Sequence, residues 1–209
     1  MKSSTVYGAV VGLLVGAGAV GLATTTMGEP PKETGKPAHD MKMPDDKMME
    51  EMMKLAMPGE HHQEIAKFAG TWHGKVTHHD PMSGKVENSE GTMVSTLVLG
   101  GRWLRQEWKG EFQGQPFEGV GYWGYDNVKK QYKGLWMDTM STAYMAMDGG
   151  FDAAKKVYTC SGECDSPMGP MTMKEVITIK DANHHSFDMF MPGPDGKDMK
   201  VMTIEYTKK

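Results

Sequence analysis

The hydrophobic pattern of the chain changes at about Gly70. From there to the C-terminus, apolar and polar residues alternate with a period of two, which is typical of β-strands with one buried face. Short breaks rich in glycine or polar residues divide this region into ten expected strands: 70–80, 86–99, 102–112, 117–125, 131–138, 143–152, 157–164, 171–180, 185–191 and 198–207. No break is long enough for a helical crossover, so neighbouring strands should be antiparallel. Because closure removes exposed edges, we predict an all-β fold, an up-and-down antiparallel barrel of about ten strands.

A different pattern precedes the strands. Over residues 45–57 (DDKMMEEMMKLAM) the methionines and leucine fall on one side of a helical wheel and the charged residues on the other. This predicts one amphipathic α-helix, which Pro58 and Gly59 end. We expect it to pack on the barrel or to cover one end. Residues 29–44 contain four prolines and many charges without a hydrophobic period, which indicates an extended linker.

Residues 1–28 have the layout of an export signal. Lys2 precedes an apolar and glycine-rich run over residues 6–23, and small residues follow. The run is also about long enough to span a bilayer, so a cleaved signal peptide and a retained membrane anchor both remain open. In either case residues 45–209, a single barrel domain with its N-terminal helix, are expected outside the cytoplasm. The domain would be periplasmic, secreted, or anchored to the inner membrane by residues 6–23, which is the only membrane contact that we expect.

Composition excludes two classes of interaction and shows one unusual feature. The net charge of −4 gives no general affinity for nucleic acid, so no nucleic-acid partner is expected. Two cysteines cannot form a disulfide framework or a cysteine zinc cluster. The anomaly is 22 methionines in 209 residues, against about five in an average chain.

Five motifs in order carry a family resemblance. They are Pro58-Gly-Glu-His-His62, Phe68-Ala-Gly-Thr-Trp72, Leu99-Gly-Gly-Arg-Trp103, Phe117-Glu-Gly-Val-Gly-Tyr-Trp-Gly-Tyr-Asp126 and Pro192-Gly-Pro-Asp-Gly-Lys197. From about Met48 to Lys209 the chain resembles the bacterial family of domain of unknown function 1579. The resemblance implies a lipocalin-like (calycin) barrel whose first strand begins Gly-x-Trp, and it implies no activity. Two features depart from the pattern. No arginine beyond Arg105 is present to stack on the tryptophan, and Cys160 and Cys164 stand where family members usually carry aromatic residues.

Strand alternation predicts an interior that is only partly dry. An inward Trp72 places Val76 and His78 on the same face, and in later strands Glu175 and His185 each share a face with apolar residues. A buried polar group needs a partner, so such faces imply either a paired network or a wet cavity. The expected ligand-binding residues are Trp72, His78, Trp123, Trp136, Phe187 and Met189.

Small barrels either fill with side chains or hold one ligand. We therefore expect an exported, non-enzymatic barrel that binds a small apolar or amphipathic molecule, or a protein partner, without a cofactor. An enzyme with its site at the barrel mouth is a second alternative, because fold does not fix function.

The first alternative is a copper-handling envelope protein. Thioether and imidazole groups suit copper, and the candidate ligands in the segment 39–62 are His39, Met48, Met52, His61 and His62. The same methionine spacing is what an amphipathic helix needs for docking, and packing is the favoured interpretation. His78, His185 and Glu175 would form a two-histidine, one-carboxylate site only if their strands brought them together.

Three further patterns allow narrower predictions. Cys160 and Cys164 are four residues apart on one strand, too far for a disulfide unless Gly162 breaks the strand. The sequence Gly119-Val-Gly-Tyr-Trp-Gly124 matches a dinucleotide-binding pattern, but no helix follows it, so we expect close packing beneath Trp123 and Tyr125 instead. Arg105 and Glu107 share a strand face, which favours a structural ion pair.

Overall fold

The computed structural model describes residues 45–209 apart from 82, 167 and 168. The predicted N-terminal signal or anchor, the linker and His39 lie outside the described residues. Among the described residues, no helix is both long enough and apolar enough to cross a membrane.

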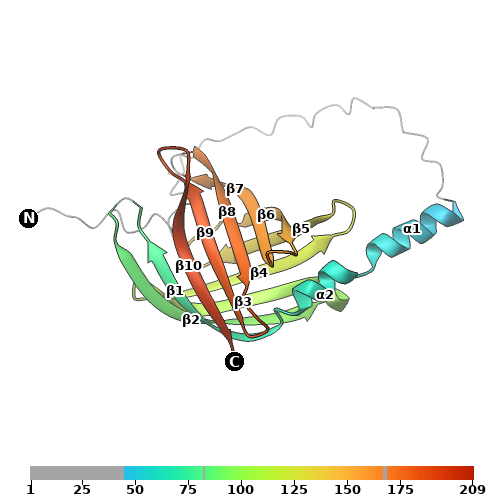
Figure 1. Ribbon diagram of the computed structural model, residues 1–209, viewed down its shortest axis with the longest axis horizontal. Helices are drawn as coiled ribbons and strands as arrows, with labels where there is room; N and C mark the ends of the chain where they lie inside the picture. The colour runs from blue at the N-terminus through green and yellow to red at the C-terminus, as the bar shows by residue number, and fades with distance from the viewer. Residues whose placement is uncertain (1–44, 82, 167–168) are drawn as a thin grey trace, which may run out of the picture. The chain divides into compact units, whose positions relative to one another are not determined.

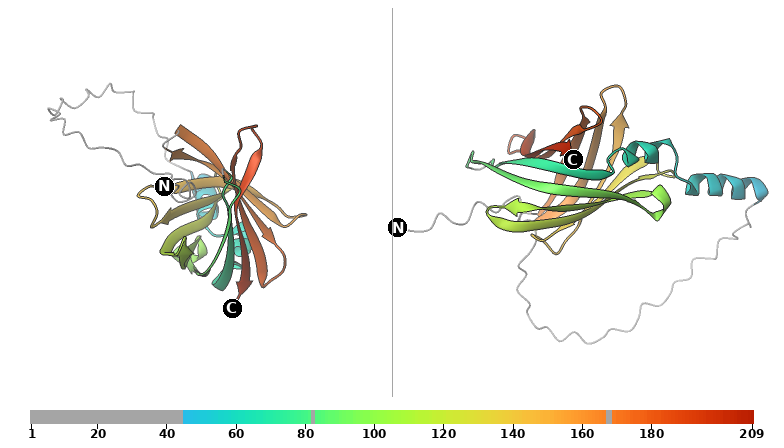
Figure 2. Two further views of the ribbon diagram at one scale, coloured as in Figure 1. Left: turned by 90° about the vertical axis from the view of Figure 1, so that its left-hand side faces the viewer. Right: turned by 90° about the horizontal axis from the view of Figure 1, so that it is seen from below.

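Ten antiparallel strands form a closed barrel, as predicted (Figures 1 and 2). They are β1 (Gly70–His79), β2 (Val86–Val98), β3 (Trp103–Phe112), β4 (Gln115–Asp126), β5 (Gln131–Asp138), β6 (Met145–Asp152), β7 (Val157–Ser166), β8 (Gly169–Ile179), β9 (His184–Pro192) and β10 (Asp198–Lys208). Each strand pairs with the next in sequence, and β1 pairs with β10, in a register that places Trp72 opposite Lys208 and His78 opposite Met202. The meander and its closure are therefore both confirmed.

The strand boundaries differ from the prediction mainly at two turns. Pro116, expected in a break, lies within β4 and is paired with Glu111, so the β3–β4 turn contains only Gln113 and Gly114, both with positive φ. The β7 and β8 strands likewise extend to Ser166 and Gly169. Proline and glycine signals therefore marked the right turns but made them too long.

Within the described part of the chain, two helices precede the barrel. The predicted helix, α1 (Asp46–Ala56), begins after Asp45, whose carboxylate accepts a hydrogen bond from the Met48 backbone N–H at 2.9 Å. α1 belongs to a separate unit (17–57) and is described by itself. All its residues are exposed, its methionine face included.

The second helix, α2 (Glu60–Ala66), was not predicted. It has only seven residues and begins directly after the Pro58-Gly59 signal that ends α1, so its pattern is too short to detect. The His62 ring accepts a hydrogen bond from the Gly59 backbone N–H at 3.1 Å and fixes its start. α2 contacts β3 and β4 and leads directly into β1, so it lies at the end of the barrel where β1 begins (Figure 1).

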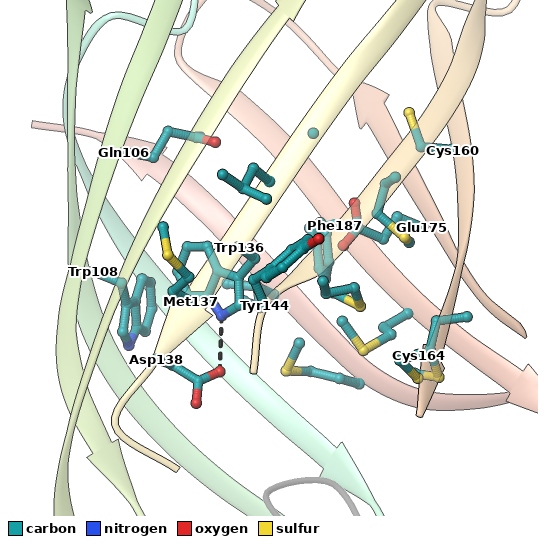
Figure 3. Close-up of a pocket in the computed structure, with 18 of the residues that line it drawn as sticks. Gln106, Trp108, Trp136, Met137, Asp138, Tyr144, Cys160, Cys164, Glu175 and Phe187 are labelled. Carbon is teal, nitrogen blue, oxygen red and sulfur yellow. Dashed lines mark hydrogen bonds between the residues drawn. The ribbon is translucent and has the colours of Figure 1, made fainter. Parts of the chain in front are cut away.

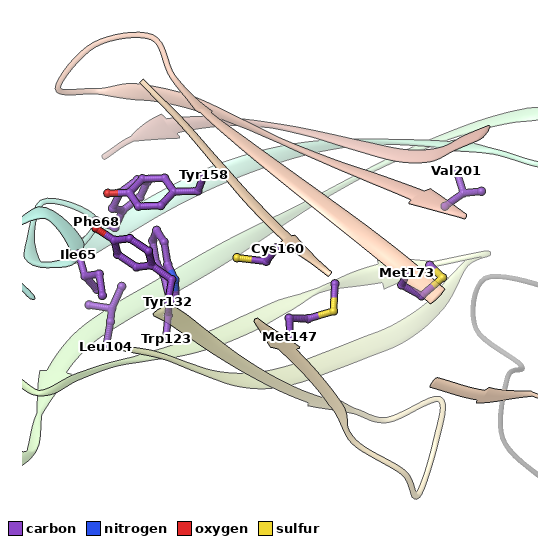
Figure 4. Packing of buried hydrophobic residues seen from close by; sticks show 10 residues of the cluster. All are labelled: Ile65, Phe68, Leu104, Trp123, Tyr132, Met147, Tyr158, Cys160, Met173 and Val201. Atoms are coloured by element: carbon purple, nitrogen blue, oxygen red, sulfur yellow. The ribbon is translucent and has the colours of Figure 1, made fainter. Parts of the chain in front are cut away.

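An aromatic core fills the barrel next to α2 (Figure 4). Phe68 contacts Trp123 edge to face at 4.9 Å between ring centroids, Trp123 contacts Tyr158 at 4.8 Å, and Tyr158 contacts Tyr132 at 4.9 Å. Burial of these rings contributes stability through apolar area and favourable ring geometry. This end of the barrel is therefore closed by side chains.

Trp72 connects this core to the barrel wall. Its indole N–H donates to the Phe68 carbonyl oxygen at 2.8 Å, and its ring contacts His185 edge to face. Lys208 Nζ lies 5.0 Å from the centre of the Trp72 ring. A lysine on the last strand therefore provides the cation over this tryptophan, where the resemblance led us to look for an arginine.

Candidate ligand-binding cavity

The other half of the barrel contains a cavity of about 720 Å³. Its walls are the inward faces of the strands, and the β5–β6 connection contributes Met140 to Tyr144. The cavity therefore lies toward the end at which β1, β3, β5 and β7 finish, opposite the end that α2 and the aromatic core close. Figure 3 shows part of its lining.

Glycines create much of this space. Trp136 lies against Gly119 and Gly121 of the neighbouring strand, where an added Cβ would come within 2.1 Å and 2.8 Å of the ring. Trp108 lies in the same way against Gly74 and Gly91, at 2.6 Å and 2.2 Å. The two indoles can lie along the wall because nothing projects from the backbone beneath them. The glycine-rich sequence in β4 thus serves close packing as predicted, but beneath Trp136 rather than beneath Trp123 and Tyr125.

Glu175 is the most unusual polar group in the cavity. Its cross-strand neighbours are Cys160 and Met189, and the next residues on its face of β8 are Met173 and Ile177. Burial raises the pKa of its carboxyl from 4.5 to about 7. Its side chain is half-buried and lines the cavity, and no hydrogen bond or ion pair engages it within the described part of the chain.

Two histidines complete the deeply placed polar groups. His185 stacks on Tyr206 with ring centroids 4.5 Å apart, and burial lowers its pKa to about 3. His78 contacts Phe112 edge to face, and burial also lowers its pKa. Both rings are therefore neutral at pH 7, and the Nδ1 atom of each is buried without a hydrogen-bond partner.

The predicted ligand-binding residues mostly meet in this cavity. His78, Trp123, Trp136, Phe187 and Met189 line it. Trp72 does not line it, because its ring packs against His185 and its indole N–H is bonded to the Phe68 carbonyl oxygen, beside the aromatic core. Strand alternation correctly predicted that Trp72 faces the barrel interior. It could not predict which part of the interior is filled by side chains.

Sequence reasoning missed other parts of the lining. Trp108 and Gln106 face the cavity on β3, and strand alternation from Leu104 to Phe112 would have placed them inward. The expected strand 143–152 wrongly included Ala143 and Tyr144, which lie in the β5–β6 connection because β6 begins at Met145. Strand alternation therefore could not show that Tyr144 lines the cavity.

The candidate copper ligands are in two helices. Met48 and Met52 lie on α1 and are exposed, while His61 and His62 lie on α2. His61 stacks on Tyr125 at 4.0 Å and its Nδ1 hydrogen-bonds Tyr132 at 2.9 Å. Each histidine thus already has a local structural contact.

Histidine, cysteine and carboxylate side chains give no group of three or more that could hold a metal within the described ranges. The possible combination of His78, His185 and Glu175 is therefore not assembled, although all three face the same cavity.

The two cysteines are free thiols on the same face of β7. The strand runs unbroken past Gly162, with Cys160 opposite Glu175 and Cys164 opposite Met171. The strand break that a disulfide requires is thus missing, and the structure contains no Cys160–Cys164 bridge. Burial raises the pKa of Cys160 to about 12, which keeps it protonated and unreactive. The predicted Arg105–Glu107 ion pair is present at 2.9 Å.

The comparison with protein families supports the architecture. The family described as "Protein of unknown function (DUF1579)" matches residues 57–208, which span α2 and the whole barrel to the end of β10. The chain belongs to this family. The match begins at Met57, so α1 lies outside it, whereas the resemblance drawn from the motifs had included the helix from Met48.

A solved structure gives the same fold. The chain is similar to the crystal structure of Rv2717c from M. tuberculosis, with a TM-score of 0.53 and 12% sequence identity, covering 73% of this chain and 99% of that one. At this identity the similarity concerns the fold alone. No curated protein matches the chain in sequence.

Proposed function

We propose that the barrel binds one small amphipathic molecule in its cavity. The observation that carries this proposal is the cavity of about 720 Å³ itself, which lies within the range of roughly 300–1,000 Å³ that is usual for small-molecule sites. One end of the barrel is packed solid, while the other is held open by tryptophans lying on glycines. Such an arrangement keeps an interior space that further large side chains would otherwise fill.

The lining supports an amphipathic ligand. Most of the wall is aromatic or methionine, which suits an apolar body, and methionine adapts to irregular shapes. Eight methionines line the cavity: Met93, Met137, Met140, Met145, Met147, Met173, Met189 and Met202. Glu175 and the free Nδ1 atoms of His78 and His185 offer a few polar contacts within this apolar surface. Part of the methionine excess therefore belongs to the ligand-facing wall.

A cavity-filling substitution tests the proposal. Gly134 lines the cavity, and an added Cβ there would meet Met147 Cβ at an ordinary 3.5 Å, so Gly134→Leu should fold and occupy ligand space. Gly150→Leu is the matched control, because Gly150 does not line the cavity and has no atom within 4 Å of an added Cβ. The neutral fluorescent probe N-phenyl-1-naphthylamine should bind the wild type and Gly150→Leu equally and Gly134→Leu at least about ten-fold more weakly. Equal binding to all three proteins, or no binding to the wild type, would refute the proposal.

Native mass spectrometry provides an independent test. Protein purified from its own host should carry an organic molecule that is released on denaturation. Gly134→Leu prepared in the same way should carry much less of it than Gly150→Leu. Equal occupancy in the two variants would place the molecule outside the cavity.

We further propose that the barrel works outside the cytoplasm. The apolar run over residues 6–23 after Lys2 supports this proposal. Fractionation of host cells should recover the protein from the periplasm, the medium or the inner membrane. Recovery from the cytoplasm alone would contradict it.

A further inference from the structure

We propose that the cavity selects organic cations, namely an amine or quaternary ammonium group attached to a hydrocarbon body, with Glu175 as the counter-ion. The inference rests on the proposed ligand-binding function and names the chemical class of the ligand. Three independent features of the lining support it.

The first feature is the isolation of Glu175. Its strand neighbours offer only a thiol and a thioether, and no basic group in the described part of the chain pairs with it. An ionised carboxylate in such a place is strongly under-solvated, so a ligand that brings a positive charge into contact with it regains the lost interaction. A neutral ligand gains much less, because it can only exchange one hydrogen bond.

The second feature is the sign of the charges around the cavity. Four further carboxylates line it: Glu111, Asp138, Glu163 and Asp165. Among the described residues that line it there is no lysine or arginine, and the two histidines there are neutral at pH 7. Three of the four carboxylates, Glu111, Glu163 and Asp165, are solvent-exposed, and Asp138 is half-buried. Together with Glu175 they give the cavity a field of one sign, which attracts cations and repels anions. Fatty acids, the obvious anionic amphiphiles, are therefore disfavoured.

The third feature is the aromatic wall. Trp108, Trp136, Tyr144 and Phe187 line the same cavity as Glu175 (Figure 3). The faces of aromatic rings attract ammonium groups, most strongly where water is excluded. The Trp136 indole N–H is held by Asp138 at 2.9 Å, which places a carboxylate at the edge of that ring. Aromatic and carboxylate groups in one cavity are the usual components of a site for an organic cation.

Three probes with the same twelve-carbon chain separate the possibilities. Dodecylamine, dodecan-1-ol and dodecanoate, each below its critical micelle concentration at pH 8, should displace N-phenyl-1-naphthylamine from the wild type with different strengths. We expect dodecylamine to compete at least about ten-fold more strongly than dodecan-1-ol, and dodecanoate to be the weakest of the three. This comparison needs no variant, so it does not depend on the folding of a mutant.

Two isosteric variants then locate the effect. Glu175→Gln should weaken dodecylamine about ten-fold and leave dodecan-1-ol unchanged. Glu205→Gln removes the same charge from a residue that does not line the cavity, where Glu205 pairs with Lys180, and it should change neither probe.

The outcomes distinguish this inference from the function on which it rests. If dodecanoate or dodecan-1-ol competes as well as dodecylamine, if none of the three competes, or if Glu175→Gln binds dodecylamine as the wild type does, the cation inference is wrong. The proposed function still stands in those cases, provided that the naphthylamine probe binds and Gly134→Leu weakens it.

Discussion

Glu175 should make the barrel less stable as the pH rises. Its folded-state pKa is about 7, while a hydrated glutamate in the unfolded chain titrates near 4.5. Between these values the unfolded chain releases a proton that the folded protein retains, so stability declines from pH 4.5 to about 7 and is then constant. The difference between the two pKa values corresponds to an upper limit of about 3 kcal/mol.

Replacement of the carboxyl by an amide removes this loss. Glu175→Gln has nearly the same volume and cannot ionise, so its free energy of unfolding should match that of the wild type at pH 5 and exceed it by about 2–3 kcal/mol at pH 8.5. Nearby groups do not titrate in this range in the folded protein. Burial raises the pKa of Cys160 to about 12, burial also raises the pKa of Tyr206, and burial lowers the pKa of His185 to about 3.

Urea unfolding followed by tryptophan fluorescence, at pH 5 and pH 8.5, measures the difference. Glu163→Gln is the control, because Glu163 is exposed and lies on the neighbouring strand, and it should differ little from the wild type at either pH. The reasoning is refuted if Glu175→Gln gives the same stability increment at both pH values, or if it destabilises the protein at pH 8.5. Either result would mean that the carboxylate is stabilised in the folded state.

Three further substitutions probe the fold around the cavity. Leu104→Ala should lower the free energy of unfolding by about 2–5 kcal/mol, because Leu104 is fully buried. Leu97 lies directly opposite it in the sheet and is 39% exposed, so Leu97→Ala should lower the free energy of unfolding far less when the two variants are compared by urea unfolding. Gly121→Ala should lower the free energy of unfolding by about 1–3 kcal/mol and shift tryptophan emission, since its Cβ would come within 2.8 Å of Trp136. Gly150→Ala, where an added Cβ meets no atom within 4 Å, should do neither. Comparable losses of stability in the two variants would exclude this steric explanation. The wild type should lose stability as the pH falls below 6.5, by at most about 3 kcal/mol at pH 4.5, because the unfolded chain takes up a proton that the buried His185 ring does not. His185→Phe should remove this loss. If thermal melts at pH 7 and pH 4.5 change in parallel for both proteins, His185 is hydrated in the folded state.

The barrel could be predicted from the sequence because the signals for its strands and turns lie in short stretches of neighbouring residues. Each strand has its own alternation and most turns contain a glycine, proline or aspartate, so ten strands and their order followed without knowledge of distant contacts. The same alternation placed His78, Glu175, His185, Phe187 and Met189 on inward faces, which the structure confirms. α2 escaped because seven residues are too few to show a helical period.

Whether the interior is filled depends on contacts between distant strands. Trp72 and Trp136 are both tryptophans that alternation turns inward. Trp72 packs against His185 and bonds the Phe68 carbonyl oxygen, whereas Trp136 lies on Gly119 and Gly121 and lines the cavity. Glycines on β4 and a tryptophan on β5 become adjacent only when the register between those strands is set. Sequence alone therefore determined the strands, their order and their inward faces, whereas the tertiary structure decided which inward residues meet. That decision produces the cavity, and with it the unpaired Glu175, because free volume and the loss of hydration depend on the whole set of neighbours around a residue.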